Sequence, residues 1–148
     1  MALSAALKQI KASEVLVGIP APKALRRGQS INNASLLFIH THGSPLKHIP
    51  ARPVLEPSVE ANQKLITPHL GAAAKDVFER KPEAADRELR LAGTIAANGA
   101  KRWFTDPRNN WAPNAPTTIK AKGSDKPLID TGALRRSFTY VVRISTSV

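Results

Sequence analysis

Glu83-Ala-Ala-Asp-Arg-Glu-Leu-Arg-Leu-Ala-Gly-Thr-Ile-Ala-Ala-Asn-Gly-Ala-Lys-Arg-Trp-Phe104 is the longest regular pattern in this chain of 148 residues. Apolar and small residues recur in it at alternating steps of four and three, the period of one face of an α-helix. That face consists of Ala85, Leu89, Ala92, Ala96, Gly99 and Trp103. Small side chains on such a face let a partner helix approach closely. The stretch therefore predicts a long helix packed on a neighbour.

A second helix is predicted immediately before this one. Its apolar face consists of Val59, Ile66, Leu70, Ala73 and Val77. Pro68 lies in its middle, so the helix is expected either to kink there or to restart with Thr67 as its cap. Lys81-Pro82 ends the pattern, and so short a connector makes the two helices an antiparallel hairpin. We interpret the hairpin as the core scaffold; alternatively, part of the Ala/Gly seam faces another subunit.

Runs rich in β-branched residues predict two strands, at residues 14–19 and 138–145. Residues 2–12 form an N-terminal helix or arm. An isolated two-stranded ribbon is marginal in water, so further strands are expected from the loops or from a neighbouring copy. The expected fold is a single α+β domain over residues 1–148. It has a small antiparallel sheet packed against an antiparallel pair of longer helices, with long extended loops.

The long loops are predicted at residues 20–32 and 105–128, which are rich in Pro, Gly, Ser and Asn. Within the second loop, residues 117–122 are expected to be basic and locally extended. Loops of this length in a small domain are usually functional or disordered.

Shorter elements are predicted on either side of the hairpin. Asn33 is expected to cap a helix over residues 34–41 that ends at Gly43. Residues 49–57 form a stiff connector, because each proline pushes its predecessor towards an extended backbone. Asp130 or Thr131 is expected to cap a short helix over residues 132–137.

The charge of the chain is strongly positive, with a formal net charge of +11. Residues 15–55 contain five bases and no acid, residues 56–90 are balanced, and residues 91–148 contain nine bases and three acids. A basic surface of this kind attracts nucleic acid or an acidic protein face. The bases are not interleaved with aromatic residues, which disfavours a stacking platform for single strands. Any contact with DNA is expected to involve phosphates without sequence reading.

Catalytic and metal-binding patterns fit the sequence poorly. The chain has no cysteine, which excludes disulfides and thiolate metal sites. His40, His42, His48 and His69 lack an acid or thiolate among them, so we interpret them as polar loop and helix-end residues. Asp130-Thr-Gly132 matches an aspartic-protease tripeptide, but the apolar strand that should precede it is missing. We predict no enzyme, no metal and no cofactor. The start of the chain lacks a long apolar stretch, so no signal peptide or membrane span is predicted.

Several segments together resemble a known family, the neck and tail-completion proteins of tailed bacteriophages, also described as virion morphogenesis or head-tail joining proteins. Its C-terminal signature is similar to Pro113-Asn-Ala-Pro-Thr-Thr-Ile-Lys120, Lys122-Gly-Ser-Asp-Lys-Pro-Leu-Ile-Asp-Thr-Gly-Ala-Leu134 and Ser137-Phe-Thr-Tyr-Val-Val142. A second motif is similar to Ile39-His-Thr-His-Gly-Ser-Pro45 followed by Ile49-Pro-Ala-Arg-Pro-Val-Leu55. The resemblance covers about residues 30–144. Members often have an acid and an aromatic residue where this chain has Thr41 and His42.

The resemblance implies a structural virion protein that forms a ring of sixfold or twelvefold symmetry around the DNA channel. Its partners would be the head connector or portal-proximal proteins and the tail tube or tail terminator, in the virion and, during assembly, in the host cytoplasm. The alternative is a small basic protein that binds DNA without sequence preference.

We expect contacts with subunits, partners or channel DNA at Arg26, Arg27, Arg52, Arg108, Trp111, Lys120, Lys122, Lys126, Arg135 and Arg136. Arg52 lies on the stiff connector and suits a bidentate contact with a carboxylate. Alternatively, it pairs within the chain with Glu56 or Glu60.

Overall fold

The structure is a computed structural model that describes residues 2–26, 28, 30–128 and 132–144. Its strands are β1 (Ser13–Gly18) and β2 (Thr139–Ile144). Its α-helices are α1 (Ala2–Ala12), α2 (Ala21–Ala24), α3 (Asn33–His42), α4 (Leu55–Ala61), α5 (Gln63–Phe78), α6 (Pro82–Trp103), α7 (Pro116–Lys122) and α8 (Ala133–Arg136). Two short 3-10 turns are η1 (Pro45–Lys47) and η2 (Pro107–Asn109).

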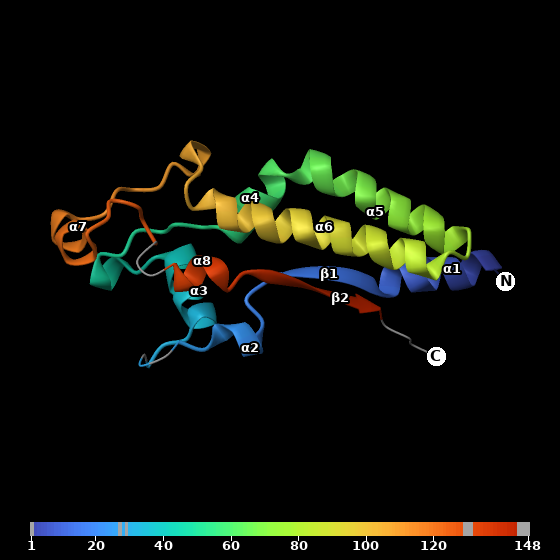
Figure 1. The fold of residues 1–148 in the computed structure, drawn as a ribbon, viewed down its shortest axis with the longest axis horizontal. Helices are drawn as coiled ribbons and strands as arrows, with labels where there is room; N and C mark the ends of the chain where they lie inside the picture. Colours follow the sequence, from blue (N-terminus) through green and yellow to red (C-terminus); the bar gives the residue numbers. More distant parts are fainter. Residues whose placement is uncertain (1, 27, 29, 129–131, 145–148) are drawn as a thin grey trace.

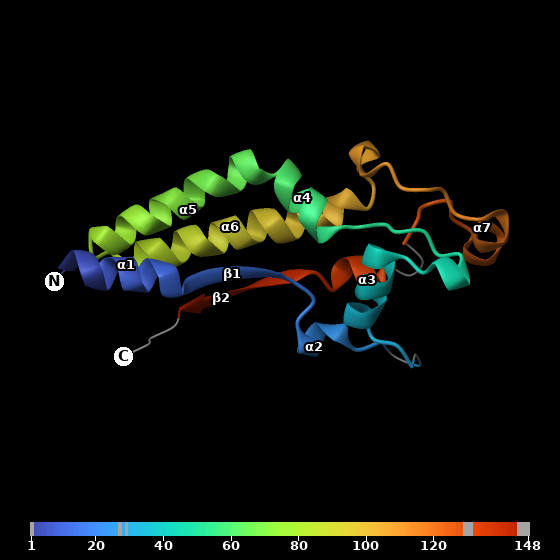
Figure 2. The same cartoon turned by 180° about the vertical axis from the view of Figure 1, so that it is seen from behind.

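The molecule is elongated, with a body and a head (Figure 1). In the body, α5 and α6 lie side by side and antiparallel, and the β1–β2 ribbon runs along α6. The head consists of α2, α3, α7, α8 and the segments that connect them, and α7 lies farthest from the body in both views (Figures 1 and 2). The predicted α+β class, a small antiparallel sheet packed on a helix pair, is confirmed.

The seam predicted on the long helix is the buried face of α6. All six of its residues are buried: Ala85, Leu89, Ala92, Ala96, Gly99 and Trp103. Ala92 and Ala96 pack with Ile66 of α5 in one buried cluster. A second, larger cluster joins α6 to the head and contains Leu37, Val54, Ala100, Trp103, Phe104, Leu134 and Phe138. The body and the head therefore share a continuous helix and a common core.

Gly93 gives the ribbon room to approach α6. A Cβ atom at Gly93 would lie 2.4 Å from Cδ2 and 2.5 Å from Cγ of Tyr140 in β2. The Tyr140 ring is attached close to the strand backbone, so the clash cannot be relieved by moving a flexible side-chain end. A larger residue at position 93 must push β2 away from α6.

We expect Gly93→Ala to destabilise the domain by about 1–3 kcal/mol, the usual cost of overpacking. Gly71→Ala is the matched control, because nothing lies within 4 Å of a Cβ atom at this exposed position of α5. That control is expected to stabilise the helix by about 0.5–1 kcal/mol through the higher helix propensity of alanine. Urea unfolding measures both changes, and equal effects of the two substitutions would contradict the close packing of α6 on β2.

The two strands form an antiparallel ribbon in which Leu16 pairs with Val141 and Val17 with Tyr140. Leu16 and Val141 are exposed, whereas their neighbours along the strands, Val15, Val17, Tyr140 and Val142, are partly covered. Among the described residues no third strand joins the ribbon; in the loops they form only an isolated bridge between Ser44 and Ile49. Each strand therefore keeps one edge without a partner strand in the described part of the chain.

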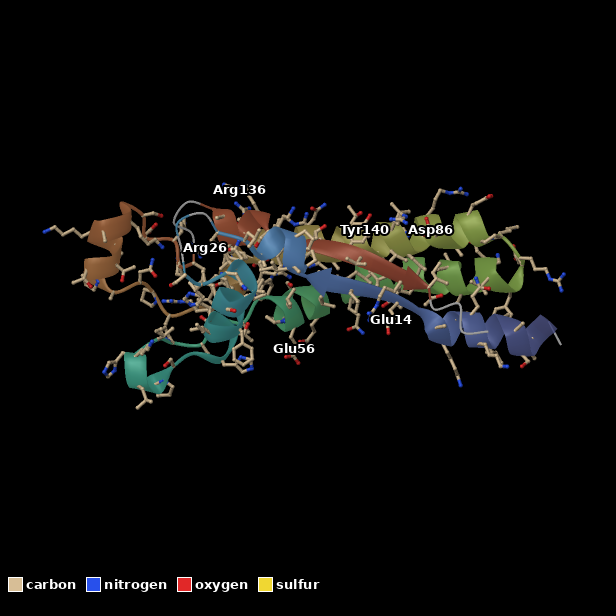
Figure 3. All side chains as sticks on the ribbon, turned by 90° about the horizontal axis from the view of Figure 1, so that it is seen from below. Glu14, Arg26, Glu56, Asp86, Arg136 and Tyr140 are labelled. Carbon is tan, nitrogen blue, oxygen red and sulfur yellow. The ribbon has the colours of Figure 1, made fainter. Side chains whose placement is uncertain are left out.

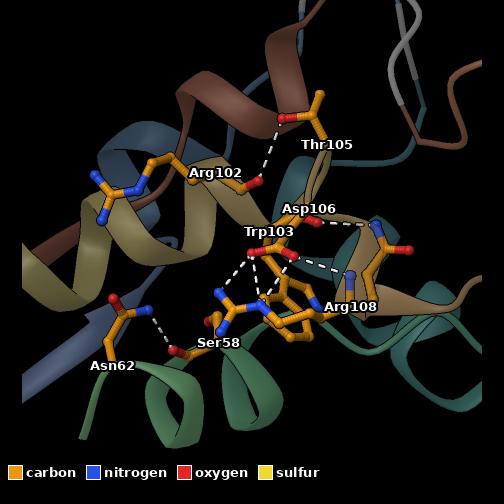
Figure 4. Close-up of polar contacts among 8 residues, drawn as sticks. Ser58, Asn62, Arg102, Trp103, Thr105, Asp106 and Arg108 are labelled. Carbon is orange, nitrogen blue, oxygen red and sulfur yellow. Dashed lines mark hydrogen bonds and ion pairs between the residues drawn. The ribbon is translucent and has the colours of Figure 1, made fainter. Parts of the chain in front are cut away.

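The break in the first helix of the hairpin falls at Asn62, between α4 and α5, and not at Pro68. The Asn62 side chain donates a hydrogen bond to the Ser58 carbonyl at 2.7 Å (Figure 4). Its amide nitrogen would be 2.6 Å from a Cβ atom at Gly99 of α6, so the glycine makes room for the junction. Pro68 lies inside α5. Both Pro68 and Lys64, whose carbonyl loses its helical donor, are exposed, so water can replace that donor.

The predicted N-cap of α3, Asn33, is wrong by one residue. Asn32 is the N-cap, and its side chain accepts a hydrogen bond from the Ser35 N–H at 2.8 Å. Asn33 is the first helical residue and is buried. The predicted end at Gly43 is confirmed, with a φ of 71° that favours glycine.

The predicted long loops contain helices. Residues 20–32 include α2, and residues 105–128 include η2 and α7, so the expected extended conformation of residues 117–122 is wrong. Pro116 begins α7, and Gly123 ends it in the left-handed region with its N–H bonded to the Ile119 carbonyl at 2.8 Å. A proline at the first position of a helix and a glycine just after its last residue are common at the ends of helices. At α8 the N-cap is Gly132, while Asp130 and Thr131 lie outside the described residues.

Candidate binding groove

A groove with a volume of about 1020 Å³ lies in the head, between α3, the connector that follows it, α7 and the start of α8. Its basic lining consists of Arg26, Lys47, Arg52 and Lys122, with His40 and His48. Its apolar lining includes Ile31, Leu36, Ile49, Leu128 and Leu134. Of the described residues, no Asp or Glu lines it. The described lining of the groove therefore combines basic and apolar side chains.

Arg52 holds the wall of the groove together. It is buried, and its guanidinium donates three hydrogen bonds to carbonyls about sixty positions further along the chain. Nε and Nη2 reach the Ala112 carbonyl at 3.1 and 2.7 Å, and Nη2 also reaches Pro113 at 3.1 Å. The alternative expectation is wrong, because Arg52 forms no ion pair with Glu56 or Glu60. A contact of Arg52 with a carboxylate of a neighbouring protein stays a prediction. Burial holds the pKa of Arg52 below its ordinary value.

Trp111 fixes the same wall from its other side. Its ring meets Phe104 edge-on, with the centroids 5.6 Å apart, and its Nε1–H donates to the Pro53 carbonyl at 3.2 Å. Residue 111 therefore lies against the core cluster and the connector that carries Arg52. Residues 111–114 of the predicted long loop are therefore part of the folded head.

The surroundings of His40 in the groove lower its pKa. Burial is the largest cause that lowers the pKa of His40 below its ordinary value, and the charges of Arg52 and Lys122 lower it further. Its Nδ1 atom is buried and has no hydrogen-bond partner among the described residues. The lowered pKa favours the neutral form of His40.

The other predicted contact residues lie outside the groove lining. Arg108 forms a fork with Asp106, with its Nη2 atom 2.6 Å from Oδ2, and lies over the Trp103 ring (Figure 4). The pKa of Asp106 is lowered mainly by its hydrogen bond to the Arg108 side chain. Arg135 donates from Nε to the Lys101 carbonyl at 2.8 Å and ties α8 to the end of α6.

Three further predicted cations lie near the groove in the head. Lys120 is an exposed residue of α7, and the Lys126 carbonyl accepts from the Lys122 ammonium at 2.8 Å. Arg136 packs over Gly132, where a Cβ atom would lie 2.8 Å from its Nη1. Figure 3 shows Arg26 and Arg136 at the head end, with Glu14 and Asp86 along the body. Arg27 lies outside the described residues.

The structure thus brings Arg26, Arg52 and Lys122 together from three separate segments. Lys47 is not among the contact residues predicted from the sequence, and His40 and His48 were considered only as possible metal ligands. Asn114, which is buried and contacts the Asp125 carbonyl at a long 3.5 Å, was also missed. These residues belong to segments that the fold brings together from far apart in the sequence, so no local pattern marks them.

The described residues contain no group of three or more His, Cys, Asp or Glu side chains placed to hold a metal ion. His69 is paired with Glu88, its Nδ1 atom 2.6 Å from Oε2. None of the described helices combines the length and the apolar character needed to cross a membrane. Comparison of the chain with protein-family models, curated proteins and solved structures found no match.

Proposed function

We propose that this chain is a structural protein of the neck of a tailed bacteriophage, where copies assemble into a ring that joins the head connector to the tail around the DNA. The observation that carries the proposal is the meeting of the two segments on which the family resemblance rests. Arg52, from Ile49-Pro-Ala-Arg-Pro-Val-Leu55, donates to the carbonyl of Pro113, the first residue of the C-terminal signature. The resemblance therefore corresponds to one structural unit and not to two unrelated stretches.

The ribbon offers a route to a ring. Because β1 and β2 are antiparallel, a neighbour in the same orientation brings its β1 antiparallel to the open edge of β2. The contact uses two different surfaces, so it repeats by rotation and closes a ring when the angle allows. Pairing of this kind removes the open edges that a lone ribbon exposes. The sixfold or twelvefold symmetry is taken from the resemblance.

In this proposal the protein acts by shape, without catalysis or a cofactor, in the virion and on the assembly pathway in the host cytoplasm. The partners are the connector or portal-proximal proteins on one side and the tail tube or tail terminator on the other. Most of the charge excess lies in two stretches of the sequence that include the helices of the head: residues 20–54 and 105–136 contain eleven lysines and arginines against three aspartates. Such a surface suits an acidic protein face or the phosphates of DNA in the channel.

The mass of the purified chain in solution, measured by light scattering at moderate salt, tests the proposal. A ring has a mass equal to six or twelve copies of the 16.0 kDa chain. A dimer whose affinity for duplex DNA falls steeply with salt would instead support the alternative, a small non-specific DNA-binding protein.

A further inference from the structure

We propose that the N-terminal helix α1 forms a second contact between subunits, in which its apolar face, with Leu3 and Leu7, packs against α1 of an adjacent copy of this chain. The inference deepens the proposed function, because the choice of a second copy as the occupant rests on the proposed ring. It assigns an interface outside the ribbon edges and names the residues that form it.

The apolar face of α1 is incompletely covered within one molecule. Leu3, Leu7 and Ile10 recur at steps of four and three, so they share one face of the helix. Leu3 is 63% exposed and Leu7 is 45% exposed, and none of residues 3–12 is fully buried. A helix of 11 residues depends for its stability on the packing of its apolar face. The face therefore has apolar surface left for a partner.

The uncovered apolar surface extends from α1 onto the end of α5. A cleft of about 420 Å³ lies between the two helices, and Leu3, Val77 and Phe78 are among the residues that line it. Phe78 is itself 45% exposed. Contiguous apolar surface of this kind marks sites of protein–protein contact. This end of the body, opposite the head, therefore has the character of an interface.

The ribbon edges alone are too small for a stable contact between copies. β1 and β2 have six residues each, so an edge about 20 Å long in a sheet layer about 10 Å thick covers about 200 Å² per partner. Stable interfaces cover about 800 Å² per partner. A ring that closes through the ribbons needs further contact area. Since α1 is joined to β1 without a connecting residue, it accompanies that strand into the contact.

The repeat of the proposed ring places neighbouring α1 helices at packing distance. α1 continues the line of β1 in two perpendicular views (Figures 1 and 3). Each copy adds two strands to the ring, so copies repeat along the sheet at about 9.6 Å, twice the strand spacing of about 4.8 Å. The axes of packed helices lie about 8–10 Å apart. Adjacent α1 helices can therefore cover each other while the ribbons pair.

The test measures the mass of the full chain by light scattering over a range of protein concentrations. In the double variant Leu3→Glu/Leu7→Glu, the concentration at which half of the chains are assembled is expected to rise at least tenfold. Leu25→Glu/Leu46→Glu is the matched control, because it makes the same change at leucines of the head that are 83% and 96% exposed. Its shift is expected to be less than twofold. Circular dichroism checks that both variants fold.

Cross-linking locates the contact independently. The chain has no cysteine, so Lys8→Cys, at an exposed position of α1, supplies a single thiol. A bis-maleimide reagent whose spacer matches the helix spacing of about 10 Å is expected to link pairs of assembled copies. Adding Leu3→Glu/Leu7→Glu is expected to abolish the linked pairs.

The outcomes separate this inference from the ring proposal. Assembly of Leu3→Glu/Leu7→Glu at the wild-type concentration, or an equal loss in the control, overturns the α1 contact and leaves the ring. Absence of linked pairs in assembled Lys8→Cys overturns it as well. A wild-type mass of two copies that falls to one in Leu3→Glu/Leu7→Glu supports the α1 contact and removes the ring. A wild type that stays a single chain at every concentration overturns both.

Discussion

Leu134→Asp is expected to leave the domain largely unfolded at room temperature. Leu134 is 5% exposed and lies in the cluster that joins α8 to Phe104 and Phe138. Truncating a buried leucine to alanine alone costs about 2–5 kcal/mol, and an aspartate adds the cost of burying a carboxylate in apolar surroundings. A domain of this kind has about 5–15 kcal/mol of total stability. Circular dichroism and the tryptophan emission maximum measure the result.

Leu46→Asp is the matched control for this prediction, because Leu46 is 96% exposed. We expect it to melt within a few degrees of the wild type, since surface changes are usually within about 0.5 kcal/mol. Leu134→Ala is expected to fold with a lowered midpoint. A cooperative, wild-type-like transition in Leu134→Asp would show that α8 does not dock on this core.

Arg52→Met is expected to destabilise the domain by about 1.5–3 kcal/mol, the range for losing hydrogen bonds made by a charged group. Methionine keeps the length and the apolar stem but loses the three hydrogen bonds to Ala112 and Pro113. Hydrogen bonds to charged groups contribute about 1.5–3 kcal/mol each and are not additive. The stability of Arg52→Lys is expected to lie between that of the wild type and that of Arg52→Met, because one ammonium cannot reproduce the planar fork of the guanidinium.

The measurement is urea unfolding followed by tryptophan fluorescence, which also reports on Trp111 beside the affected carbonyls. Arg87→Met, the same change at an exposed position of α6, serves as the control and is expected to change the midpoint little. If both substitutions shift the midpoint equally, Arg52 does not hold the head together.

The body of the fold could be predicted because its signals are local. The seam of α6 combines a helical period with small residues, and all six of its members are buried. The strands were predicted within one residue, at 14–19 and 138–145 against Ser13–Gly18 and Thr139–Ile144. Runs of β-branched residues bounded by Pro or helix signals suffice for that. α7 was missed although Pro116 and Gly123 mark its ends, because its few apolar residues give no periodicity.

The groove could not be predicted as a site. Arg52 was singled out from its stiff connector, but its carbonyl partners at residues 112 and 113 have no sequence pattern. Backbone acceptors are available at every residue, so only the tertiary fold selects one. The same holds for the break at Asn62, which depends on the space left by Gly99 on another helix.

Electron microscopy of the purified chain tests the central claim most directly, which is that copies of this molecule join through their ribbons into a closed ring. The account predicts end-on images with sixfold or twelvefold rotational symmetry and a central opening, in which β1 of each copy lies beside β2 of the next. Particles that remain single elongated molecules or twofold dimers at every protein concentration, with the ribbon edges open to solvent, would contradict it.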